Sequence, residues 1–440
     1  MNDEVFIMSS CNTLLQSLHI GAYDQTLAGL YALDGTQESL ERARARAIRV
    51  TQGLMDTFSP AETAQAALFS GPGRTEIGGN HTDHQHGHVL CGSVDLDMLA
   101  CAVLTGTNVV RILSEGYPTL EISLDDLDPR PEEINTSAAL VRGVAGKLAQ
   151  MGYSLSGFDA YMTSTVLSGS GLSSSAAYEV LVGNIFNHFC CGDQLDPILI
   201  AKIGQYAENV YFGKPCGLMD QMGSSVGSAV AIDFADPSTP VVTRVDYDFS
   251  KSGHALCIVD TGSCHADLTD DYSDITREMG SVAAYFGKTV LRDVPESDFR
   301  QAIPALRASC GDRAVLRAIH FYDDDRKAVA EAEALARGDF DAFLSLINAS
   351  GISSALHLQN TWSIADPRQQ AIPLALAVGR ELLEGTGAIR VHGGGFAGTI
   401  QAFVPNEKLS SFKAGMEAVL GTETCHILHI RPQGGCVVIS

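Results

Sequence analysis

The sequence predicts a protein of mixed α and β structure with two or three domains. Its 440 residues far exceed the roughly 150 residues of an ordinary domain. Alternating apolar and polar residues predict strands, for example at 107–113 and 119–123, whereas apolar residues at helical spacing predict helices, for example at 137–151. Because both patterns recur along the chain, the fold class is mixed α and β.

The elements follow a weakly patterned segment of about 35 residues. A helix is predicted from Thr36, a capping residue, to Phe58, and Ser59-Pro60 ends it. A strand at 228–234 leads to Asp236 to Pro240, the best loop signal in the middle of the chain. We therefore expect one domain over residues 1–240 and a second over 241–440. In the second, the patterns predict helices at 314–337, 338–349 and 367–385 and strands at 255–259, 399–404 and 436–439.

Composition excludes several classes of function. Hydrophobic residues make up 45% of the chain, but no apolar run approaches the length of a membrane span, and the acidic N-terminus does not resemble a secretory signal. The formal net charge is −23 with no basic run to offset it, so a nucleic acid is a poor partner. The eleven cysteines show no paired spacing. We therefore expect a soluble cytoplasmic protein with reduced thiols.

The most informative segment runs from Leu167 to Ala177 and consists mainly of glycine, serine and alanine. Apolar residues at helical spacing follow it, including Val180, Leu181 and Ile185, so the loop lies at a helix N-terminus. Such a terminus offers free backbone N–H groups and the positive end of the helix dipole, which suit a phosphate. The serine hydroxyls add donors and a ligand for magnesium. The alternative is a capped helix after a flexible loop.

A second segment, Gly71 to Gly87, concentrates an arginine, two carboxylates, two amides and three histidines in a glycine-rich stretch. This density of hydrogen-bonding groups suits a polyhydroxylated ligand. The alternative is a zinc site, because alternating histidines on a strand share one face. Those histidines are His84, His86 and His88.

Two further segments contain single residues of interest. Glu208 lies within a helix that begins at Asp196 and ends at Gly213, and Asp220 falls near the start of the next element. An ordinary first-turn aspartate, stabilised by the helix dipole, is the alternative reading of Asp220. A glycine-rich turn, Val391 to Phe403, leads into a strand, and tight packing alone would explain its composition.

Taken in order, these four segments resemble the GHMP small-molecule kinases, and specifically the galactokinases. The resemblance runs from about residue 37 to the C-terminus and leaves roughly the first 35 residues as an unmatched extension. It implies an α+β, two-domain GHMP kinase fold, in which an N-terminal domain like the second domain of ribosomal protein S5 meets a ferredoxin-like C-terminal domain. The matching segments are Arg74 to Asp83, Gly169 to Ala177, Cys216 to Gln221 and Gly393 to Gly398.

The resemblance also implies roles for individual residues. Asp220 and Arg74 would be catalytic: Asp220 would receive or orient the C1 hydroxyl of the sugar, and Arg74 would keep Asp220 ionised and stabilise the transferring phosphoryl group. Ser175 and Glu208 would bind Mg²⁺. ATP would lie against Gly169, Ser170, Gly171, Leu172, Ser173, Ser174 and Ser175. The sugar would contact Glu76, Asn80, His81, Asp83, Gly217, Tyr272 and Gly395.

The sequence departs from the galactokinase pattern in the sugar-binding segment. Galactokinases usually carry asparagine two residues after the signature arginine and glutamate six after it, whereas here Glu76 and Asn80 exchange the two. Because the glutamate normally contacts the C6 hydroxyl, an isolated loss of it would admit a C6 carboxylate. If the two side chains lie together, the exchange preserves the pocket. Gly78 and His84 also replace the usual isoleucine and tyrosine.

The expected reaction is therefore the ATP- and Mg²⁺-dependent phosphorylation of galactose at C1. The same chemistry on galacturonate, N-acetylgalactosamine or arabinose is the first alternative. A sugar sensor without catalysis is the second, although Arg74, Ser175, Glu208 and Asp220 are all present. We expect no nucleic-acid or membrane partner. The sequence does not fix the oligomeric state, and a monomer is favoured.

Overall fold

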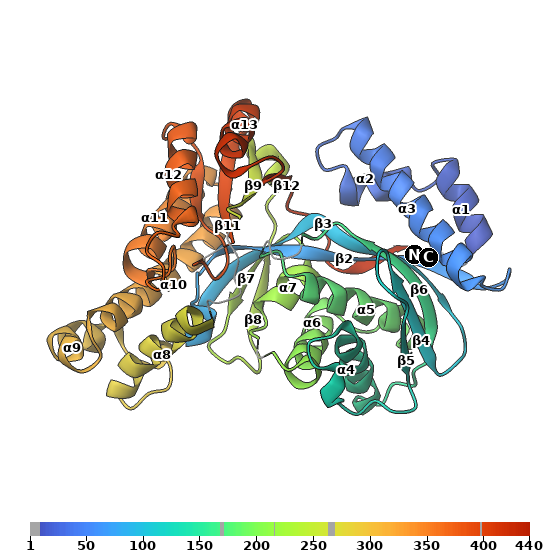
Figure 1. The fold of residues 1–440 in the computed structure, drawn as a ribbon, viewed down its shortest axis with the longest axis horizontal. Coiled ribbons are helices and arrows are strands. Elements are labelled where there is room, and N and C mark those ends of the chain that lie inside the picture. The colour runs from blue at the N-terminus through green and yellow to red at the C-terminus, as the bar shows by residue number, and fades with distance from the viewer. Residues whose placement is uncertain (1–8, 168–170, 215, 263–268, 397) are drawn as a thin grey trace.

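The computed structural model describes residues 9–167, 171–214, 216–262, 269–396 and 398–440. Within these ranges the chain forms two sheets covered by helices (Figure 1). The α+β class predicted from the sequence is confirmed. No helix in the described ranges combines the length and apolar character that a bilayer span requires.

The larger, nine-stranded sheet is mostly antiparallel, and its central strands are β2 and β3. The order β1-β2-β3-β6-β4-β5 forms one path, while β13 also pairs with β2 and β7 pairs with β3 and β8. Its strands are β1 (Ser9–Ser10), β2 (Gln65–Gly78), β3 (His88–Leu104), β4 (Val109–Ser114), β5 (Leu120–Ser123), β6 (Phe158–Ser164), β7 (Ala229–Asp233), β8 (Val241–Val245) and β13 (Cys436–Ile439).

Helices cover both faces of this sheet. Alternate residues of β2 explain how: Ala67 and Phe69 pack towards one group of helices, whereas Ala66 and Leu68 pack towards the other. One face carries α1 (Cys11–His19), α2 (Asp24–Tyr31) and α3 (Gln37–Phe58). The other carries α4 (Ser137–Gln150), α5 (Ser174–Cys190), α6 (Pro197–Tyr206) with its π-helical extension η3 (Ala207–Phe212), and α7 (Met219–Val226).

The second sheet is antiparallel and has the order β10-β11-β9-β12. Its strands are β9 (His254–Asp260), β10 (Ala388–Val391), β11 (Thr399–Pro405) and β12 (Cys425–Leu428). The helices around it are α8 (Thr269–Tyr285), α9 (Glu296–Ser309), α10 (Asp312–Ala336), α11 (Phe340–Ser353), α12 (Ala371–Leu383) and α13 (Leu409–Leu420). Short helical turns lie at η1 (Asp83–Gln85), η2 (Pro131–Glu133), η4 (Phe249–Lys251), η5 (Leu291–Asp293), η6 (Ser354–Leu358) and η7 (Asn406–Lys408).

Strands from both sides of residue 240 build the larger sheet. Strand β8 begins just after the predicted boundary and pairs with β7, and β13 returns from the end of the chain to pair with β2. The division into 1–240 and 241–440 therefore stays a prediction, and the sheet itself is not confined to the first part.

The segment before Thr36 is more structured than its sequence pattern indicates. Helices α1 and α2 bury Leu14, Leu18, Leu27 and Leu30 against α3 and the sheet. Each helix is shorter than ten residues, so it offers too few turns for a clear apolar periodicity. Packing against the sheet, rather than local propensity, stabilises them.

Candidate active site

Arg74 and Asp220 form an ion pair between the central sheet and α7. The guanidinium Nε and Nη2 lie 2.8 and 2.7 Å from Asp220 Oδ1. Arg74 follows an irregularity in the pairing of β2 with β3, and Asp220 lies in the first turn of α7. Gly223 permits this approach, because a Cβ there would lie 2.9 Å from the Cβ of Arg74. Two residues far apart in the sequence are therefore held at bonding distance.

The surroundings of Asp220 favour its charged form. Burial opposes the charge, but Arg74 and the hydroxyl of Ser173, which donates to Oδ2 at 2.7 Å, outweigh it and hold the pKa of Asp220 below its usual value. The side chain is still 28% exposed. Asp220 is thus an ionised carboxylate that a ligand can reach.

The predicted phosphate loop leads into α5 beside this pair. Ser173, the N-cap residue, has a φ of 54°, and its side chain does not cap the helix. Arg74 holds this loop in place. Its side chain donates to the carbonyl oxygen of Gly171, and its backbone N–H donates to the carbonyl oxygen of Leu172. The side chain of Leu172 is buried in the core, so only its backbone can face a ligand. Gly169 and Ser170, also predicted to contact ATP, lie outside the described residues.

Ser175 and Glu208, the predicted magnesium ligands, are neighbours. The hydroxyl of Ser175 in the first turn of α5 donates to Glu208 Oε1 at 3.1 Å. Glu208 is buried in η3, and Lys214 Nζ lies 3.5 Å from its Oε1. A hydroxyl and a carboxylate are hard oxygen donors, and Mg²⁺ in phosphate sites commonly takes one or two such ligands. The pair therefore fits the ion, with phosphate oxygens left to complete its coordination.

Two residues behind Glu208 were not anticipated from the sequence. Gln221 Nε2 donates to Glu208 Oε2 at 2.8 Å and to Glu179 Oε2 at 2.9 Å. Burial raises the pKa of Glu179 well above its ordinary value, and the charge of Glu208 raises it further. Gln221 thus orients Glu208 from the helix that carries Asp220. The spacing of Glu179, one helical turn after Ser175, is the sequence signal that could have placed this second carboxylate near the site.

Among the predicted sugar contacts, Glu76 and Asn80 lie in direct contact. Asn80 Nδ2 donates to Glu76 Oε1 at 2.9 Å and to the carbonyl oxygen of Gly393 at 2.7 Å. Asn80 Oδ1 accepts from Asn360 at 2.8 Å. Arg390 of β10 donates to Glu76 Oε1 at 2.8 Å. The exchanged acid and amide therefore form one buried network.

Arg390, which the sequence analysis missed, compensates the charge of Glu76. Burial raises the pKa of Glu76 to about 7, although Arg390, Arg74 and Asn80 oppose this rise. A cation inside the short apolar strand Ala388–Val391 is a sequence signal that could have identified it.

The unusual Gly78 has a direct structural consequence. A Cβ at this position would lie 1.6 Å from Glu331 Oε2 of α10, so the isoleucine usual in galactokinases would displace that side chain. Burial raises the pKa of Glu331 well above its ordinary value. Among the described residues neither carboxylate oxygen of Glu331 has a hydrogen-bond partner. Glu331 therefore occupies the space that Gly78 leaves, and burial there favours the protonated form of its carboxyl group.

The other predicted sugar contacts converge on the glycine turn after β10. His81 bonds to the carbonyl oxygen of Gly394 at 2.9 Å, and Tyr272 donates to that of Gly395 at 2.8 Å. Asp83 lies beside Gly217, where a Cβ would stand 2.9 Å from Asp83 Oδ2. The structure thus gathers these residues around the space between β2, α7 and the glycine turn.

The zinc alternative loses its geometric basis. His84 lies in the helical turn η1, His86 has a left-handed backbone, and only His88 belongs to strand β3. They therefore do not share one face of a strand. In the part of the chain that the structure describes, no group of three or more potential metal-binding side chains is close enough to hold an ion.

His392 joins the glycine turn to the phosphate loop. Its Nε2 lies 3.1 Å from Thr75 Oγ1 and its Nδ1 2.9 Å from Thr399 Oγ1, and a Cβ on Gly171 would lie 3.2 Å from Nδ1. Burial, followed by the charges of Arg74 and Arg390, lowers the pKa of His392 to about 3. The imidazole is thus neutral in the folded protein.

This shift predicts a loss of stability in acid. Above the ordinary histidine pKa the imidazole is neutral in both states; below it only the unfolded chain takes up a proton, until the pH reaches about 3. Over that window His392 should lower the free energy of unfolding by up to roughly 1.4 kcal/mol per pH unit. We expect His392→Gln to reduce this slope in urea unfolding, with exposed His19→Gln as control. An unchanged slope in His392→Gln would contradict the assignment.

Comparison with known proteins finds similar kinases. Residues 139–228 match the model of the GHMP kinases N-terminal domain, and residues 56–103 match the galactokinase galactose-binding signature. A curated galactokinase from Streptomyces coelicolor is 29% identical over 377 residues, which cover 84% of this chain and 93% of the relative.

Solved structures agree on the fold. The galactokinase of Lactococcus lactis, solved with galactose, has a TM-score of 0.73 and 23% identity, covering 88% of this chain and 98% of that one. The mevalonate kinase of Methanococcus jannaschii has a TM-score of 0.59 and 14% identity, covering 84% and 99%. The chain is thus similar to the GHMP kinases over its N-terminal part, and its residues 56–103 match the galactose-binding signature of the galactokinases.

Proposed function

We propose that this protein transfers the γ-phosphoryl group of ATP to the C1 hydroxyl of galactose, in the cytoplasm. The observation that carries the proposal is the Arg74–Asp220 pair, held beside the N-terminus of α5 in a chain with the galactokinase signature. A partly exposed, ionised carboxylate lies next to a helix terminus suited to phosphate. The reacting hydroxyl and the phosphoryl group can therefore meet at Asp220.

The residues of the chain would act mainly by positioning and electrostatics. Asp220 receives the proton of the C1 hydroxyl as the new O–P bond forms and the bond to ADP breaks. The sugar hydroxyl takes the place of Ser173, which now donates to Asp220. Arg74, bonded to Asp220 and to the carbonyl of Gly171, lies between the base and the phosphate loop and stabilises the charge on the transferring group.

Ser175 and Glu208 would hold Mg²⁺ against the β- and γ-phosphates. The ion would neutralise charge that develops on the phosphate oxygens. Gln221 keeps Glu208 oriented towards α5, and the backbone of Gly171 to Ser174 would contact the phosphates. These hard-oxygen donors support magnesium, and the presence of the whole set argues against a sugar sensor without catalysis.

Galactose is favoured over its C6 carboxylate, galacturonate. A carboxylate on the sugar needs a cation, and the nearest candidate, Arg390, is fully buried and already bonded to Glu76. Asn80 is also buried and uses its amide group within the protein. Arg390 and Asn80 therefore shape the pocket from behind. The contact between Glu76 and Asn80 preserves one acid and one amide.

We expect ADP release with Mg-ATP to be fastest on galactose in a panel that includes galacturonate, N-acetylgalactosamine, arabinose and glucose. The loss on galacturonate should be about tenfold or more, because burying an unpaired carboxylate costs at least one charged hydrogen bond. Faster turnover on galacturonate would keep the kinase but reject our account of Glu76 and Asn80. No turnover on any sugar, with galactose still bound, would favour the sensor.

A further inference from the structure

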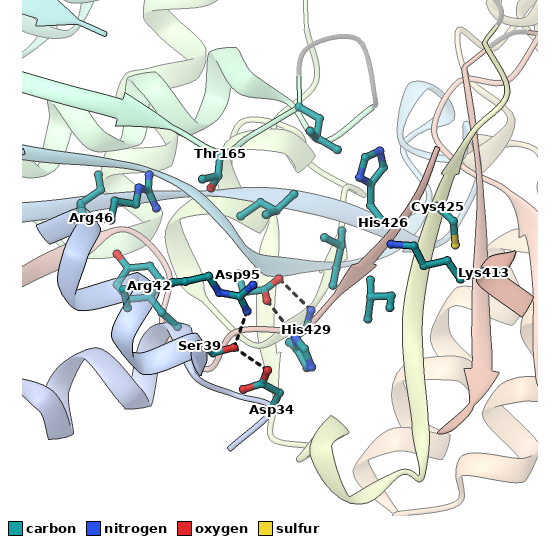
Figure 2. A pocket seen from close by; sticks show the side chains of 17 residues that line it. Asp34, Ser39, Arg42, Arg46, Asp95, Thr165, Lys413, Cys425, His426 and His429 are labelled. Carbon is teal, nitrogen blue, oxygen red and sulfur yellow. Dashed lines mark hydrogen bonds and ion pairs between the residues drawn. The ribbon is translucent and has the colours of Figure 1, made fainter. Parts of the chain in front are cut away.

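A second cavity lies away from the Arg74–Asp220 pair, on the other face of the larger sheet. It has a volume of about 640 Å³, within the range of small-molecule sites. Its walls come from the end of α2, from α3, from the middle of β3, and from β12 and α13 (Figure 2). The segment before residue 36, which the galactokinase resemblance does not cover, contributes Tyr31 and Asp34. The extension thus helps to build the cavity.

Basic side chains are concentrated in this cavity, although the chain as a whole is strongly acidic. Arg42 and Lys413 enter from opposite sides, from α3 and α13, with His426 of β12 beside Lys413 (Figure 2). Their ion pairs within the protein are long: 3.6 Å for Arg42 with Glu38 and 3.7 Å for Lys413 with Glu417. Such pairs on a helix surface contribute little energy. Arg42 Nη2 also donates to Ser39 Oγ at 2.8 Å, which leaves its other N–H groups and Lys413 available to a ligand.

The acidic residues of the cavity already have hydrogen-bond partners within the protein. Asp95 accepts two hydrogen bonds from His429, from the backbone N–H at 2.9 Å and from Nδ1 at 3.0 Å. Asp34 accepts from Ser39 Oγ at 2.7 Å and from the backbone and hydroxyl of Thr36. Both carboxylates serve local structure, and they are outnumbered by the lining cations Arg42, Arg46 and Lys413, so the formal charge of the cavity is positive.

The cavity also has an apolar surface and touches the segment that precedes the phosphate loop. Leu96, Leu99 and Ile427 line it between the charged walls. Thr165, another lining residue, donates its backbone N–H to the carbonyl of Asp97 at 2.9 Å, and its hydroxyl accepts from the N–H of Asp97 at 3.0 Å. A ligand with a compact organic body and an anionic group would match both kinds of wall.

We propose that this cavity binds a small phosphorylated metabolite, with Arg42 and Lys413 holding the phosphate from opposite sides. The two cations supply point charge and directed donors, which suit a dianion. The apolar strip between them accommodates the carbon skeleton. This site is separate from the phosphate loop, because α3 and α5 cover opposite faces of the sheet.

The test is a binding titration with two probes, inorganic phosphate and ribose 5-phosphate. Galactose, Mg²⁺ and a non-hydrolysable ATP analogue are kept at saturation so that the active site is filled. We expect one further site per chain by calorimetry, with affinity that falls as salt is raised. In Arg42→Gln/Lys413→Gln the affinity should drop at least about tenfold.

The control is a double variant that loses the same charge at positions outside the cavity. Arg337→Gln/Lys288→Gln also removes one arginine and one lysine, both exposed, and should bind the probes as the unmodified protein does. Thermal unfolding checks that both variants are folded. Absence of the further site, or equal affinity in the two double variants, would overturn the proposal. Because the comparison changes only the cavity, it does not depend on the sugar specificity of the active site.

Discussion

Asp220→Asn should transfer phosphate between roughly 10²- and 10⁴-fold more slowly than the unmodified protein. The substitution keeps the size of the side chain and its contact with Ser173 but removes the negative charge that receives the C1 proton. It also leaves Arg74 without its ionic partner. Because the loss arises in the chemical step, kcat should fall while binding of galactose, measured by calorimetry, changes little.

Asp196→Asn provides the matched control. Asp196 caps α6 by accepting from the N–H of Leu199 at 2.8 Å, and asparagine caps a helix about as well as aspartate. The control therefore makes the same chemical change outside the active site and should retain full activity in the ADP-release assay. If Asp220→Asn kept a kcat close to that of the control, Asp220 would not be the base.

Local sequence patterns identified the elements with clear end signals. Thr36 caps α3 and Asp196 caps α6 as expected, and Gly213 ends the extension of α6 with a left-handed backbone. These predictions succeed because capping depends on residues within one turn of the helix end. Helix α12 begins at Ala371, four residues later than its pattern indicates, because Pro373 has no N–H for the carbonyl of Gln369 and its ring would clash with an earlier helical turn.

Long-range contacts could not be obtained in this way. The sequence shows that Glu76 and Asn80 are exchanged, but only the fold shows that they touch and that Arg390 joins them from β10. Likewise, Glu331 fills the space over Gly78 from α10. No local pattern links residues hundreds of positions apart, and one sequence alone gives no covariation. The substrate pocket was therefore less predictable than the phosphate loop.

Arg390→Gln should destabilise the protein by roughly 3–5 kcal/mol, because it leaves the buried Glu76 without its cation. Both side chains are almost completely buried, so water cannot replace the lost partner. Urea unfolding at about two pH units above the pKa of about 7, where Glu76 is ionised in the folded protein, measures the change. Arg337→Gln, which removes an exposed arginine, should remain within about 0.5 kcal/mol of the unmodified protein.

The pH dependence and a second substitution separate charge from packing. Burial already raises the pKa of Glu76 to about 7, and Arg390 opposes this rise. Loss of Arg390 therefore raises the pKa of Glu76 further. The folded state then keeps a proton that the unfolded state releases, so stability falls as the pH rises through this range and recovers in acid. The deficit of Arg390→Gln should shrink at low pH. Glu76→Gln should offset part of it above the pKa of Glu76, because the double variant buries no unpaired charge, and should offset little in acid, where Glu76 is already neutral. A deficit unaffected by either change would mean that Arg390 stabilises the fold through packing alone, and that Glu76 is neutral in the native protein.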